Sequence, residues 1–178
     1  MDSLTTVALA ARDGDRAALA RFVELAQADV WRYCAYLTDA QTADDAAQET
    51  LIRAIGSLHG FRGEGDAKVW LLTIARRTCA DIIRSQVRRR SLFDRLRGQH
   101  DPTPVAPSER LELAELLESL DDDRRDAFVL TQVLGLSYEE AAGVMNCAIG
   151  TIRSRVARAR MHLVDVVIAT DDRRALGS

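Results

Sequence analysis

Hydrophobic residues recur every three or four positions along most of the chain, which is the spacing of one face of an α-helix. No stretch of useful length alternates polar and apolar residues in the manner of a half-buried strand. The apolar pattern, interrupted by turn residues, predicts helices over about residues 5–11, 16–37, 42–58, 67–89, 109–120 and 123–134, followed by a helix pair within 136–160. A capping box formed by Thr42 and Asp45 is expected to open the third helix. The sequence therefore predicts an all-α protein.

A proline-rich stretch divides the chain into two helical lobes. Pro102, Pro104 and Pro107 follow in quick succession, and proline at this density interrupts both helices and sheets. The expected parts are an N-terminal lobe, a flexible linker, a C-terminal lobe and a tail, over residues 1–90, 91–107, 108–170 and 171–178.

The helix pair within residues 136–160 has the features of a helix-turn-helix. Ser137 and Glu140 have the spacing of a capping box at the start of the first helix. Asn146 tolerates the left-handed backbone that a tight turn needs. The second helix, from Ile149, carries an apolar stripe on one side and small residues flanked by arginines on the other. Such a helix can lie on a core with one side and in the major groove of DNA with the other.

The outward face of this second helix supplies candidate DNA-binding residues. Small side chains let the backbone approach base edges, while flanking arginines reach phosphates or guanines. The candidates are Gly150, Thr151, Arg153, Ser154, Arg155, Ala157 and Arg158. For Arg155, and for Arg160 nearby, acidic neighbours in the protein are an alternative to phosphates. An arginine-rich helix can also be a solvated or partner-binding face, but the small central residues favour DNA.

Charge is distributed unevenly along the chain, whose formal net charge is −3. Residues 76–97 and 153–160 are strongly cationic, whereas residues 39–49 and 109–126 are mostly acidic. Separate acidic and basic surfaces fit a protein that meets both nucleic acid and a protein partner.

Several other classes of protein are disfavoured. Residues 1–19 lack a signal-peptide pattern, and no run reaches the roughly 20 apolar residues that span a bilayer, so membrane insertion is not expected. Three widely separated cysteines (Cys34, Cys79 and Cys147) favour neither a disulfide framework nor a zinc site and suit a reducing cytoplasm. The three histidines lie in unrelated contexts without catalytic or metal-ligand spacing. We therefore expect no enzyme activity, no metal and no cofactor.

Three motifs in the N-terminal lobe complete a family pattern. They are the acidic DDAAQET helix (44–50), the FRGEGD loop (61–66) and the WLLTIARR helix (70–77). Together with GLSYEEAAGVMNCAIGTIRSRVARAR (135–160), they resemble the extracytoplasmic-function (ECF, group IV) sigma factors of the sigma-70 family. The resemblance covers nearly the whole chain and implies the minimal type, with region 2 before the linker and region 4 after it. It implies a protein that binds core RNA polymerase and directs promoter-specific initiation by recognising the minus-thirty-five and minus-ten elements and assisting melting.

The resemblance assigns the acidic helix to polymerase docking. Its candidate residues, expected to contact the clamp helices of core RNA polymerase, are Asp44, Asp45, Gln48 and Glu49. Attraction between the helix dipole and acids near a helix start is an alternative explanation for Asp44 and Asp45, but not for Gln48. The polymerase flap and promoter DNA are the other expected partners, and the sequence leaves open whether an anti-sigma protein also binds.

The resemblance also assigns the loop and the long helix after it to the minus-ten element. The loop would capture a base flipped from the non-template strand, and the helix would hold the nearby duplex. The candidates are Arg62, Gly63, Glu64, Trp70, Arg76, Arg77, Arg84 and Arg88. The loop could instead be a plain connection; Phe61 is expected in the core, and Trp70 either in the core or as a wedge.

Two positions depart from the family pattern. Arg77 stands where the family commonly has Asn, so we expect a phosphate contact there rather than a base contact. Ala148 stands where the family usually has proline, which makes the turn less rigid. In the helix-turn-helix, the outward-face residues of the second helix match those that face the minus-thirty-five element, and Arg158 can read guanine through two hydrogen bonds.

A helix-turn-helix transcriptional regulator acting alone, with an N-terminal partner-binding lobe, is the alternative function. It would bind its operator specifically without polymerase. A sigma factor instead needs polymerase to place its two lobes at the promoter spacing.

Overall fold

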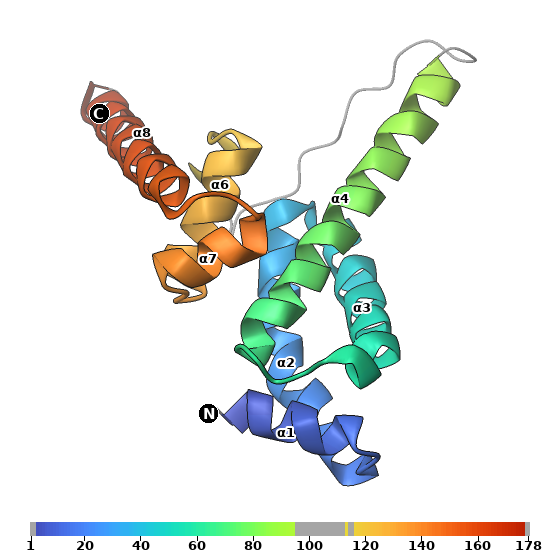
Figure 1. Ribbon diagram of the computed structural model, residues 1–178. Helices are drawn as coiled ribbons and strands as arrows, with labels where there is room; N and C mark the ends of the chain where they lie inside the picture. The colour runs from blue at the N-terminus through green and yellow to red at the C-terminus, as the bar shows by residue number, and fades with distance from the viewer. Residues whose placement is uncertain (1–2, 95–112, 114–115, 177–178) are drawn as a thin grey trace. The chain divides into compact units, whose positions relative to one another are not determined.

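The computed structural model describes residues 3–94, 113 and 116–176, with the backbone alone for residues 40, 90–94 and 171–176 (Figure 1). All regular structure in these residues is helical, which confirms the predicted fold class. The elements are α1 (Ser3–Arg12), α2 (Arg16–Leu37), α3 (Ala40–Ser57), the 3₁₀ turn η1 (Leu58–Gly60), α4 (Ala67–Asp94), α6 (Asp122–Phe128), the π-helical η2 (Val129–Val133), α7 (Tyr138–Met145) and α8 (Ile149–Leu176). The chain forms two compact units: the first contains α1 to α4, and the second contains α6, η2 and α8.

The core of the first unit is centred on α2, which packs against α1, α3 and α4 (Figure 1). Phe22, Val30 and Tyr33 lie on one face of α2 at helical spacing and are fully buried. The buried positions of α3 are small, and small residues let two helix backbones approach closely. These positions include Ala43, Ala46, Ala47 and Ala54.

The start of α3 differs from the prediction. The helix begins at Ala40, and Asp39 is its N-cap. The Asp39 carboxylate accepts a hydrogen bond from the Thr42 backbone N–H at 2.8 Å and another from the Thr42 hydroxyl at 2.9 Å. The capping box predicted for Thr42 and Asp45 is therefore wrong, because an acid three residues upstream already occupies both donors of Thr42.

Two helices run further than the apolar pattern indicated. α4 continues to Asp94, so residues 91–94 of the expected linker are helical, and residues 95–107 lie outside the described part of the chain. α8 continues to Leu176, through most of the expected tail. Both extensions contain arginine and leucine and lack glycine and proline, so helix propensity carries the backbone on after the apolar stripe has ended.

In the second unit, the helix predicted over residues 123–134 changes its hydrogen bonding midway. α6 is followed by a π-helical segment, in which the Leu134 N–H donates to the Val129 carbonyl at 2.9 Å. Gly135, with a φ of 74°, then reverses the chain, and the Leu136 N–H closes the turn on the Leu130 carbonyl at 3.0 Å. This turn connects the π-helical segment to α7. The helix predicted over residues 109–120 lies partly outside the described residues, although residues 116–118 are helical.

Candidate functional site

The helix-turn-helix has the predicted local geometry. The Ser137 N–H donates to the Glu140 carboxylate at 2.7 Å, and the Glu140 N–H donates to the Ser137 hydroxyl at 3.2 Å, which completes the capping box. Asn146 adopts a φ of 50° in the turn between α7 and α8. The Ala148 carbonyl accepts from the N–H groups of Thr151 and Ile152, so α8 starts without the family's proline.

The two faces of α8 differ in burial as the sequence indicated. Ile152, Val156 and Ala159 are buried against the core, although Ile149, the first residue of the helix, is 39% exposed. Gly150 lies in open space, where an added Cβ would meet no atom within 4 Å. Thr151 is half-buried, and the exposed residues of the outward face are Gly150, Arg153, Ser154, Ala157 and Arg158. This face is therefore accessible to a ligand as large as the major groove of DNA.

Two arginines of α8 are engaged within the protein. Arg155 is half-buried, pairs with Asp123 of α6, and lies 3.7 Å from the Cys147 sulfur through Nη1. The Arg160 guanidinium donates to the Gln132 side chain at 2.6 Å. Phosphates and acidic neighbours were the two partners considered for Arg155, and in the free protein it pairs with an acidic neighbour, Asp123. The pair joins α8 to α6 in the free protein, and a DNA contact by Arg155 stays a prediction.

The expected docking residues gather on one surface of α3. Asp44, Asp45 and Gln48 are exposed, and Glu49 is half-buried. Asp44 accepts a hydrogen bond at 2.6 Å from the indole N–H of Trp31 on α2. This contact holds the carboxylate in place on the surface.

Sequence reasoning missed the apolar part of this surface. Ile52 is 57% exposed and Ile55 is 40% exposed, and both continue α3 beyond Gln48 and Glu49. Trp31, which is bonded to Asp44 at the start of the same helix, is 38% exposed. Acids at the start of a helix face with exposed isoleucines further along are typical of a partner-binding surface. Ile52 lies four residues after Gln48 on the same helix face, a spacing that the sequence already contained.

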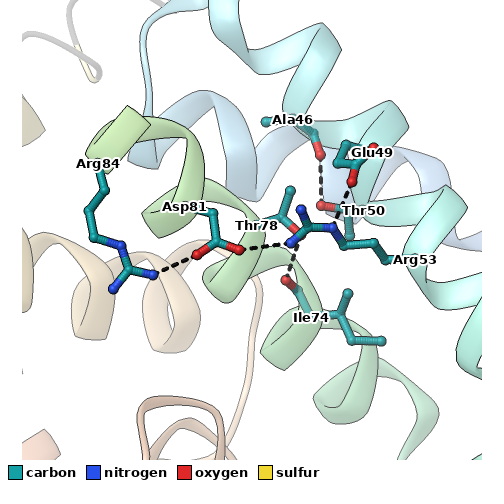
Figure 2. A network of polar contacts seen from close by, with 8 residues as sticks. All are labelled: Ala46, Glu49, Thr50, Arg53, Ile74, Thr78, Asp81 and Arg84. Atoms are coloured by element: carbon teal, nitrogen blue, oxygen red, sulfur yellow. Dashed lines mark hydrogen bonds and ion pairs between the residues drawn. The ribbon is translucent and has the colours of Figure 1, made fainter. Parts of the chain in front are cut away.

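A chain of ion pairs links α3 to α4 (Figure 2). Arg53 donates to Glu49 at 2.7 Å through Nε and to Asp81 at 2.9 Å through Nη1. Asp81 also accepts from Arg84 at 2.6 Å. Hydrogen bonds from Arg53 and then Arg84 lower the pKa of Asp81 below its ordinary value of 3.8. The chain therefore connects a candidate docking residue, Glu49, with a candidate DNA-binding residue, Arg84.

The loop between η1 and α4 is anchored by an aromatic pair. Phe61 is buried, which confirms its predicted place in the core, and its ring centroid lies 5.0 Å from that of Trp70, with the two planes at 40°. Trp70 is half-buried against Phe61, so its burial lies between that of a core residue and that of an exposed wedge, the two alternatives considered for it. Arg62 and Glu64 are highly exposed, with side chains 81% and 78% accessible. The tip of the loop is therefore presented outward.

Most of the cationic candidates of α4 share one face. Residues at intervals of seven and four positions stay on the same side of a helix, and here they are Trp70, Arg77, Arg84 and Arg88. This stripe runs for about 27 Å at 1.5 Å per residue. Its three arginines are exposed. Arg76 is half-buried and lies on a different side of the helix, so it does not join the stripe.

Comparison with known proteins identifies the family. The models for sigma-70 region 2 and sigma-70 region 4 match residues 22–89 and 110–163. The ECF RNA polymerase sigma factor SigC of Mycobacterium tuberculosis is 45% identical over 168 residues, which cover 92% of this chain and 90% of that protein. This chain belongs to the ECF sigma factors of the sigma-70 family. It directs promoter-specific transcription initiation and is not itself an enzyme.

Other comparisons agree with this assignment. The ECF sigma factor EcfG of Rhodopseudomonas palustris is 38% identical over 134 residues, covering 70% of this chain and 71% of that protein. The solved structure of the sigma factor RpoE from Bartonella quintana in complex with the anti-sigma factor NepR matches with a TM-score of 0.73 at 29% identity. That match covers 83% of this sigma factor and 95% of the other chain.

Two searches of the described residues found nothing. In the ranges that the structure covers, no helix is both long and apolar enough to cross a membrane. Over the same ranges, no group of three or more His, Cys, Asp or Glu side chains could hold a metal ion.

Proposed function

We propose that this sigma factor reads its promoter with two separate faces, one on each unit, while a third face docks on core RNA polymerase. The observation that carries the proposal is the outward face of α8, where exposed Arg153 and Arg158 flank the small residues Gly150, Ser154 and Ala157. A helix with this surface fits the major groove, because its backbone can approach the bases while its arginines reach guanines and phosphates.

The minus-thirty-five element is assigned to α8. Arg158 is the candidate base reader, with Arg153, Thr151 and Ser154 beside it. Neither Arg153 nor Arg158 takes part in an ion pair among the described residues, in contrast to Arg155. Their guanidinium groups can therefore bind DNA without first breaking such a pair.

The minus-ten element is assigned to the 61–66 loop and the stripe on α4. The exposed side chains of Arg62 and Glu64, with Gly63 between them, form the candidate pocket for a flipped base. Trp70 lies at the start of the stripe, and its three arginines would follow the duplex backbone through phosphate contacts. With these roles, residues 1–90 act as region 2 and residues 108–170 as region 4, although α4 extends beyond the first boundary.

Polymerase docking is assigned to α3. Asp44, Asp45, Gln48 and Glu49 would pair with cationic residues of the clamp helices, which gives steering and register. The exposed Ile52 supplies apolar area that would be buried in the same contact. We further propose that region 4 contacts the polymerase flap, that the protein acts in the cytoplasm where polymerase and DNA are found, and that an anti-sigma protein sequesters it, as NepR binds RpoE.

Transcription from a randomised promoter library by reconstituted holoenzyme tests these assignments. Arg158→Ala should relax base preference at one minus-thirty-five position by about 1–3 kcal/mol. Arg77→Ala should weaken promoter binding for all sequences and lower the salt slope by about one. Arg160→Ala is the matched control, because that guanidinium is bonded to Gln132. An unchanged preference profile for Arg158→Ala would exclude the proposed base contact.

A further inference from the structure

α1 holds both ends of the 61–66 loop. At the start of the loop, the Arg12 guanidinium donates to the Phe61 carbonyl at 3.2 Å. At its end, the Ala67 N–H donates to the Thr5 hydroxyl at 2.9 Å, and both of these residues are buried. A buried N–H without an acceptor is costly, so Thr5 fixes the point at which the loop enters α4.

The middle of the loop also rests on α1. Gly63 has a φ of 72°, and a Cβ built on it would lie 3.0 Å and 3.1 Å from the two terminal carbons of Leu9. A side chain at this position would therefore crowd Leu9, and the positive φ also favours glycine. The three α1 residues, Thr5, Leu9 and Arg12, are spaced by four and three positions, so one face of α1 lies along the whole loop.

The guanidinium of Arg12 is itself held in place. Asp13 accepts from Arg12 Nε at 2.8 Å, while Nη1 points to the loop. By contrast, the outward side chains of the loop are held only loosely: Arg62 and Glu64 approach one another at 3.9 Å and are otherwise highly exposed. The shape of the loop backbone thus depends on α1, while the exposed side chains of Arg62 and Glu64 are accessible to a ligand.

We propose that α1 is a brace that sets the base preference of the 61–66 loop, with Thr5, Leu9 and Arg12 as positioning residues. The proposal rests on the proposed function of that loop. α1 (Ser3–Arg12) precedes the residues matched by the region 2 model, which begin at 22. Specificity for one promoter base would therefore depend on residues that contact no DNA.

Base preference at a single promoter position is the readout. Holoenzyme transcribes a library randomised over the minus-ten and minus-thirty-five elements, and Glu64→Ala first identifies the position that the loop reads. A specific base contact gives a preference of about 5- to 150-fold. Arg12→Ala and Thr5→Val should each reduce the preference at that position at least about threefold and leave the minus-thirty-five profile unchanged. Arg12→Lys and Thr5→Ser should restore it, because each keeps the donor or acceptor.

The control is Arg21→Ala on α2, whose guanidinium pairs with the exposed Glu24. A loss of total transcription with an unchanged base ratio for Arg12→Ala and Thr5→Val would overturn the brace, since only folding would then be affected. The brace would also be overturned if Glu64→Ala shifted the preference and neither α1 variant did. No change with Glu64→Ala itself would instead refute the proposed role of the loop.

Should Thr5→Val fail to fold, Leu9→Ala provides the second test. It removes the side chain beneath Gly63 without leaving a polar group unsatisfied. We expect the same loss of preference at the loop position, and a wild-type ratio in folded Leu9→Ala holoenzyme would overturn the proposal.

Discussion

Replacing Arg53 by methionine removes the guanidinium group that joins α3 to α4 through ion pairs, and retains most of the aliphatic volume. Arg53 makes two charge-assisted hydrogen bonds, to Glu49 and to Asp81. The three side chains are 40%, 43% and 48% exposed, so solvent screens both pairs. Exposed pairs contribute about 0.2–1 kcal/mol each. We expect Arg53→Met to lower the free energy of unfolding of the first unit by about 1 kcal/mol.

A double-mutant cycle separates the bridge from other effects of the substitution. Arg53→Met, Asp81→Asn and the double variant are unfolded in urea and followed by circular dichroism. Because the two side chains are in direct contact, we expect a coupling energy of about 0.2–1 kcal/mol. The matched pair is Arg21 and Glu24, which lie within α2 and join no two helices. Their coupling should be about 0.2–0.5 kcal/mol, as for other exposed pairs three positions apart on a helix.

The coupling should depend on pH in a defined direction. The pKa of Asp81 is lowered in the folded protein by Arg53 and Arg84. A group with a lowered folded pKa stabilises the fold above its unfolded value and loses that contribution as pH falls through the folded value. The coupling should therefore be constant around neutral pH, begin to fall as pH approaches the ordinary value of 3.8, and disappear only below the lowered pKa of Asp81 in the folded protein. A coupling that is absent at neutral pH, or that persists unchanged in 1 M salt, would refute this account of the bridge.

Three further outcomes follow from other contacts. Phe61→Ala should destabilise the first unit by about 3–5 kcal/mol because the buried ring packs on Trp70; urea unfolding measures it, and a loss below about 1 kcal/mol would contradict a core role. Ser137→Ala should lower the free energy of unfolding of the second unit by about 0.5–2 kcal/mol, because α7 loses its cap. Urea unfolding measures this loss, and Ser137→Thr is the control. Equal stabilities of Ser137→Ala and the wild type would argue against the cap. Asp81→Asn should strengthen holoenzyme binding to a minus-ten duplex at low salt, because Arg84 loses its carboxylate partner; fluorescence anisotropy that shows weaker binding would disagree.

Periodic features of this sigma factor could be predicted from its sequence. The buried stripe of α8, the capping box at Ser137 and the left-handed Asn146 each depend on residues within one helix or turn. Local spacing determines such features, and no information on distant contacts is needed. Phe61 was placed in the core on other grounds, because an aromatic side chain in such a loop is more often a core anchor than a stacking platform.

Two kinds of feature could not be predicted in the same way: those in which hydrogen-bond partners compete, and those that join residues far apart in the sequence. Thr42 has the spacing of a helix cap, but in the fold its hydroxyl donates to Asp39, which caps the helix instead. The bridge from Arg53 to Asp81 joins residues 28 positions apart, and a sequence pattern does not encode that contact. The same holds for the contact of Arg12 with the loop, which spans 49 positions. The partner of Arg155 was one of two alternatives, and only the fold selected Asp123.

The central claim is that two DNA-reading faces work together only on polymerase. Run-off transcription tests it most directly, with purified core RNA polymerase and a promoter selected from the library, and with each element scrambled in turn. We expect transcripts only when core polymerase and this sigma factor are both present, with loss of output when either element is scrambled, and no specific promoter binding by the sigma factor alone. Tight, sequence-specific binding by the protein alone, with no stimulation of core polymerase, would contradict the account and favour a regulator that acts by itself.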